Sequence, residues 1–143
     1  MAVVTTDAYG HRSPTGVGSL GTALAGAAVS TTAAGTIVGT TAAGAAPTVT
    51  SVNANDSAGT FILNPVTGGG SQAAGAVAQV FFSQPYSATP KAVIVNVCDN
   101  AAGASGVAVA ASAQSITTTG FTVNVSAALT TARNYGVTFQ VIP

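Results

Sequence analysis

Charged side chains are scarce in this sequence. Only 4% of its 143 residues are Asp, Glu, Lys or Arg, whereas soluble domains carry about 25%. A freely diffusing monomer uses mixed surface charge to stay apart from its copies, so this composition indicates a surface that is covered in use. The three cations cannot form the positive stripe that phosphate binding requires, and we expect no nucleic-acid partner.

Residues that carry catalysis or hold metals are equally rare. His11 is the only histidine, Cys98 is the only cysteine, and glutamate is absent. A single cysteine excludes an intrachain disulfide and a cysteine-based zinc site. Asp56 and Asp99 lie among turn residues, where a short carboxylate caps backbone amides. We therefore expect neither an enzyme nor a bound metal.

One nucleotide-binding motif is present in form only. Residues 16–21 match GxGxxG, but that motif needs a preceding strand, a following helix and an acidic residue about 20 positions later. The next acidic residue is Asp56, so we expect no cofactor. No run approaches the roughly 20 apolar residues of a membrane helix, and we expect no membrane contact.

The composition changes near Pro47. Residues 16–46 consist almost wholly of Gly, Ala, Thr, Ser and Val, and a segment with so few large apolar side chains has little to bury. We therefore predict two parts: an extended N-terminal arm over residues 1–46, ordered against other surfaces, and a folded domain over residues 47–143.

Short β segments bounded by turn residues follow Pro47, which is typical of an all-β fold. We predict a single jelly-roll-like β-sandwich of about seven strands. The predicted strands are Thr48–Val52, Thr60–Leu63, Ala76–Ser83, Lys91–Cys98, Val107–Thr117, Phe121–Ser126 and Tyr135–Ile142. Alternation with period two predicts a core of Val93, Val95, Val97, Phe121, Val123, Val125, Tyr135, Val137, Phe139 and Val141.

Candidate partner-binding residues lie outside these strands. Tyrosine is enriched at protein interfaces, and Tyr9 lies in the arm, where no local core exists for it to pack on. Tyr86 lies in a loop bounded by Pro85 and Pro90, where ordinary loop packing is an alternative role. The predicted partner-binding set is Tyr9, His11, Arg12, Leu20, Leu24 and Tyr86.

Three segments, Ala76–Val97, Ile116–Val123 and Tyr135–Ile142, resemble β-sandwich domains of tailed-phage structural proteins. Capsid decoration (cement) proteins and head or tail fibres use such Thr/Ala/Gly-rich sequences. The resemblance implies a virion protein on the capsid surface, a homotrimer that binds the major capsid protein and stabilises the head. The alternative that it implies is a receptor-binding or lectin-like module at a fibre tip.

Parts of the same segments also resemble H-type lectin domains. In those domains a stretch like Ala76–Val97 precedes a strand that begins as Gly120-Phe121 does here. The chain has no tryptophan, and it lacks the aromatic and acidic ending that those lectins carry. These two departures argue against sugar binding.

Overall fold

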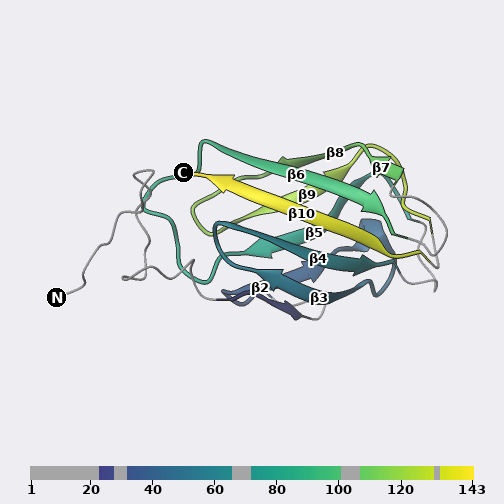
Figure 1. The fold of residues 1–143 in the computed structure, drawn as a ribbon, viewed down its shortest axis with the longest axis horizontal. Coiled ribbons are helices and arrows are strands. Elements are labelled where there is room, and N and C mark those ends of the chain that lie inside the picture. Colours follow the sequence, from purple (N-terminus) through teal and green to yellow (C-terminus); the bar gives the residue numbers. More distant parts are fainter. Residues whose placement is uncertain (1–22, 28–31, 66–71, 101–106, 131–132) are drawn as a thin grey trace.

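The chain folds into two five-stranded sheets packed face to face (Figure 1). This arrangement, seen in a computed structural model, confirms the all-β sandwich that the sequence predicts. Among the described residues the helical element is one 3-10 turn, Thr41–Ala43, and no helix there is long and apolar enough to cross a membrane. The structure describes residues 23–27, 32–65, 72–100, 107–130 and 133–143.

The first sheet has the strand order β1-β2-β5-β9-β8, and the second has the order β3-β4-β10-β6-β7. All pairings between these strands are antiparallel except the parallel pair of β1 with β2. The strand bounds are β1 Ala25–Ala27, β2 Thr36–Gly39, β3 Thr48–Ala54, β4 Ala58–Asn64, β5 Gly75–Phe81, β6 Ala92–Asp99, β7 Val107–Val109, β8 Ala111–Gln114, β9 Gly120–Val125 and β10 Tyr135–Ile142.

Side chains from the inner faces of the two sheets meet in one apolar core. Phe121 of β9 and Phe139 of β10 have ring centroids 5.3 Å apart, so the sheets are joined by direct aromatic contact. The predicted core is confirmed, because eight of its members are buried and the other two, Val93 and Val95, are partly buried against the same cluster.

One predicted strand, Val107–Thr117, is two strands that belong to different sheets. β7 pairs with β6, whereas β8 pairs with β9, and the chain passes between the sheets at Ala110. The sequence does not reveal this crossing because Ala110 lies in a run of Ala and Val without Gly, Pro, Asn or Asp to mark a break.

Residues before Pro47 contribute strands and core side chains, which the composition did not predict. β2 pairs with β5, and Ile37 is 0% exposed. Leu24 is also buried, and its backbone N–H donates to the Ala54 carbonyl at 2.8 Å. The described residues of the expected arm are therefore ordered against this chain's own sheets; residues 1–22 lie outside the described ranges.

Small residues explain how a segment with so few large side chains packs here. A Cβ atom at Gly26 would lie 2.5 Å from the carbonyl oxygen of Val49, so β1 approaches β3 more closely than a larger residue permits. The composition of a segment shows how many large side chains it contains. It does not show that β1 can lie this close to β3. Leu24, Ile37 and Val38 are the larger apolar side chains of this segment that are buried.

We predict that Ile37→Ala lowers the free energy of unfolding by about 2–5 kcal/mol, because it removes a large buried side chain and leaves a cavity. The matched control is Ile94→Ala, which we expect to change that free energy by about 0.5 kcal/mol or less, since Ile94 is 57% exposed. Chemical denaturation followed by circular dichroism measures both. Equal effects of the two substitutions would restore the view that the segment before Pro47 lies outside the core.

Candidate functional site

A groove lies on the outer face of the second sheet, over β4, β10 and β6. β10 pairs with both of the other strands, so its outward side chains lie at the centre of this face. Burial alternates along β10: Val137 and Phe139 point into the core, while Thr138 and Gln140 are exposed. The groove therefore depends on the same alternation that builds the core.

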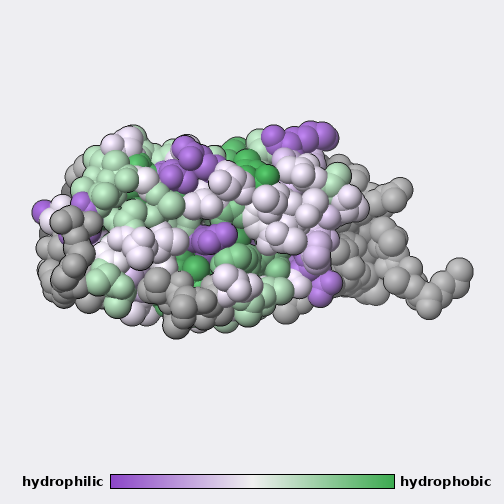
Figure 2. Space-filling view, turned by 180° about the vertical axis from the view of Figure 1, so that it is seen from behind, coloured by the Kyte–Doolittle hydropathy of each residue, from purple (hydrophilic) through white to green (hydrophobic). Residues whose placement is uncertain are grey.

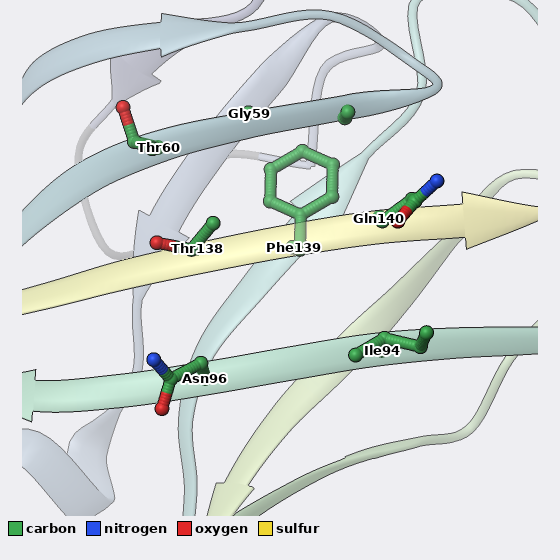
Figure 3. Close-up of a pocket in the computed structure, with 8 residues that line it drawn as sticks. Gly59, Thr60, Ile94, Asn96, Thr138, Phe139 and Gln140 are labelled. Carbon is green, nitrogen blue, oxygen red and sulfur yellow. The ribbon is translucent and has the colours of Figure 1, made fainter. Parts of the chain in front are cut away.

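The first hollow of this groove has a volume of about 350 Å³. Figure 3 shows Thr60 on β4, Thr138 and Gln140 on β10, and Asn96 and Ile94 on β6. The register aligns these residues in two rows across the sheet. One row is Thr60, Thr138 and Asn96, and the other is Ala58, Gln140 and Ile94.

A second hollow, of about 400 Å³, adjoins the first. The two hollows share Thr60 and Thr138 in their walls. Beyond that row the register places Gly136 between Ile62 of β4 and Cys98 of β6. Because Gly136 has no side chain, the centre of this row is open. The remaining lining residues are Ser51, Phe61, Asp99, Asn100 and Val137.

The groove offers hydrogen bonds and apolar contact rather than acid–base chemistry. Asn96 and Gln140 are exposed, and each amide supplies both donors and an acceptor. The charged residue in the lining is Asp99, whose carboxylate accepts a hydrogen bond from Arg133 and raises the pKa of that guanidinium. Within the described ranges no three His, Cys, Asp or Glu side chains gather as metal ligands.

The outer face of the first sheet carries a different surface. Its hollow, of about 330 Å³, is lined mainly by small residues and by two amides, Gln114 and Asn124. Figure 2 shows this side of the molecule, where hydrophilic residues are scattered among pale and green ones. The exposed large apolar residues of the described chain, Ile94 and Ile142, both lie on the second sheet. The groove over β10 is therefore the better candidate site.

Of the predicted partner-binding residues, the structure describes Leu24 and Tyr86. Tyr9, His11, Arg12 and Leu20 lie outside the described residues. Leu24 is 5% exposed and forms part of the core, so its side chain is not presented at the surface. Leu24 directly precedes β1, the edge strand of the first sheet, and its N–H donates to Ala54 of β3 in the second sheet, so Leu24 lies between the two sheets.

Tyr86 packs within its loop, which is the alternative role that the sequence allowed. Its ring meets that of Phe82 edge-on, with centroids 4.9 Å apart. Its hydroxyl donates to the backbone carbonyl of Asp56 at 2.8 Å. Burial raises the pKa of Tyr86 above its ordinary value.

Asp56 caps backbone amides as expected, but these amides are distant in sequence. Its carboxylate accepts hydrogen bonds from the Ser83 N–H at 2.7 Å, the Ser83 hydroxyl at 2.6 Å and the Gln84 N–H at 3.1 Å. The local turn is capped by Asn55 instead, whose side-chain oxygen accepts from the N–H groups of Ser57 and Ala58. Asp56 thus joins the turn after β3 to the loop after β5.

Sequence reasoning missed the groove residues. Thr138 and Gln140 alternate with predicted core residues, so their exposure could be read from the sequence. Their proximity to Asn96 and Thr60 depends on the register of β10 with β6 and β4, which joins segments far apart in the chain. Period-two alternation carries no information about that register.

A comparison with protein families matches residues 77–142 to the H-type lectin domain, somewhat less than half of the chain. The match supports the resemblance to H-type lectin domains. It provides no support for the resemblance to a capsid decoration protein. It spans β6 and β10 completely, and these strands supply most of the groove. A lectin family is non-catalytic, which agrees with the expectation that the chain is not an enzyme. Comparisons with curated proteins and with solved structures found no match.

We predict that Asp56→Ala lowers the free energy of unfolding by about 3 kcal/mol, because it removes the charged acceptor of three part-buried hydrogen bonds. Asp56→Asn keeps one oxygen that can accept from the Ser83 N–H, so we expect a smaller loss. Thermal and urea denaturation measure both. Wild-type stability in Asp56→Ala would show that these hydrogen bonds do not hold the two turns together.

Proposed function

We propose that the protein is a non-catalytic carbohydrate-binding module and that the groove over β4, β10 and β6 is its binding site. One observation carries the proposal: the segment that matches the H-type lectin domain contains the strands that present Asn96, Thr138 and Gln140 on one face. The match supports this role over capsid decoration, and it agrees with the alternative of a lectin-like receptor-binding module.

The chemistry of the groove suits a sugar. A sugar hydroxyl both donates and accepts hydrogen bonds, and the amides of Asn96 and Gln140 can satisfy it in either sense. The C–H face of a sugar ring is apolar, and Ile94 offers an exposed apolar surface in register with Gln140. A few polar groups beside apolar surface are the usual composition of small-molecule sites.

The wider setting stays a prediction from the sequence. A fibre tip or another exposed part of a virion is the location that fits a receptor-binding module. The homotrimer, the contact with the major capsid protein and the roles of Tyr9, His11, Arg12 and Leu20 likewise remain predictions. Of these, the homotrimer agrees best with glycan binding, because three copies of one weak site bind a repetitive surface more tightly than one copy does.

We predict that Asn96→Ala and Gln140→Ala each weaken glycan binding about 3- to 10-fold, as expected for the loss of one or two neutral hydrogen bonds. A glycan array first identifies a bound sugar, and titration calorimetry then compares the variants. The matched control is Gln114→Ala, which removes an exposed amide from the other sheet and should bind like wild type.

Two results would contradict the proposal. The first is that the folded protein binds no sugar on the array. The second is that Gln114→Ala loses binding while both groove variants keep it, which would place the site on the first sheet.

A further inference from the structure

We propose that the ligand is a linear, uncharged oligosaccharide that lies along β10 and occupies both hollows, rather than one terminal sugar in one hollow. This inference rests on the proposed function and specifies its ligand. The two hollows share a wall, because Thr60 and Thr138 border both of them. The two hollows are therefore parts of one continuous groove.

The length of the groove exceeds a single sugar ring. Its central residues on β10 run from Gly136 to Gln140, which corresponds to roughly 13 Å at the usual rise of a strand. The hollows at its two ends have volumes of about 350 Å³ and 400 Å³, each within the range of small-molecule sites. A single pyranose ring would leave one of them empty, whereas a short chain of linked rings fills both.

The three rows across the groove alternate in character. The middle row, Thr60, Thr138 and Asn96, is polar. The rows on either side each contain an isoleucine, Ile62 in one and Ile94 in the other. Linked sugar rings present a similar alternation, because apolar ring faces are separated by polar linkages and hydroxyls. The middle row is thus placed to bind the polar groups between two rings.

Gly136 keeps the second hollow open. A Cβ atom built there meets only the carbonyl oxygen of Cys98, at 4.0 Å, so the space above Gly136 is free for a ligand. The backbone of Gly136 does not have a positive φ, and a larger residue there is compatible with the strand. A substitution at this position therefore blocks the hollow without a conformational reason to unfold the sheet.

The charge of the groove favours a neutral ligand. Among its lining residues Asp99 alone is charged, and its side chain is 8% exposed and bonded to Arg133. Among the residues that the structure describes, no lysine, arginine or histidine lines either hollow. A sulfated or carboxylated glycan would lose hydration of its anion here, and the described cation beside the groove, Arg133, is already bonded to Asp99.

The experiment measures affinity against chain length. Titration calorimetry uses neutral glucan, galactan and mannan fragments of one to four sugar units, and their sulfated counterparts, with wild type and Gly136→Val. We expect wild-type affinity to rise at least tenfold from the single sugar to the longest fragment of the preferred series. Gly136→Val should lose most of that gain and keep the affinity of wild type for the single sugar, and sulfation should weaken binding.

A second pair of variants covers the case in which Gly136→Val does not fold. Cys98→Met extends a side chain into the same hollow from β6, and we expect it to reduce the gain with length in the same way. Ser112→Met is its control, since it adds the same side chain at an exposed position on β8 of the other sheet and should bind as wild type does. Circular dichroism establishes that each protein is folded before titration.

The outcomes separate this inference from the proposed function. Equal affinity for one and four units, unchanged in Gly136→Val and Cys98→Met, would overturn the extended ligand and leave sugar binding intact. Tighter binding of the sulfated fragments would overturn the neutral ligand alone. If no fragment binds to any folded protein and the array is also blank, the proposed function itself is wrong.

Discussion

Strand β10 is the constraint on which both the core and the candidate site depend. It pairs with β4 on one side and β6 on the other, and it carries alternating inward and outward side chains along its whole length. Its inward residues, such as Phe139, meet the opposite sheet, while its outward residues form the floor of the groove. A shift of β10 by one residue would exchange these two sets, since the side-chain period is two. The packing of Phe139 against Phe121 therefore fixes which side chains of β10 face the groove.

The few carboxylates of this chain that the structure describes form hydrogen bonds or ion pairs within the protein. Asp56 and Asp99 are both nearly buried, at 2% and 5% exposed, and each has close partners. Asp56 joins two turns through Ser83 and Gln84, and Asp99 pairs with Arg133. A buried carboxylate without such partners would be costly. These aspartates consequently stabilise loops at the sandwich ends and leave the faces of the sheets uncharged.

The sequence predicts well those features that depend on neighbours along the chain. The strands around Val97, Val123 and Val137 and the core that they form follow from local alternation. Features that join distant segments were not predictable in this way. The pairing of β2 with β5, the capping of Ser83 by Asp56 and the row from Thr60 to Asn96 each need a register that the alternation does not contain.

The absence of tryptophan argued against sugar binding. In the groove it limits the kind of contact that a sugar ring could make. Aromatic rings border the groove at Phe61 and Phe139, but these are 1% and 2% exposed and cannot stack on a ligand. Apolar contact with the proposed sugar would therefore come from Ile94 and Ile62. Most of its binding free energy would come from hydrogen bonds, each of which contributes only about 0.5–1.5 kcal/mol. A groove of this kind gains affinity by extending along the ligand, because each further sugar adds contacts. Repeated copies of the module would add to this through multivalency, which is the physical link between an uncharged sheet face and the predicted homotrimer.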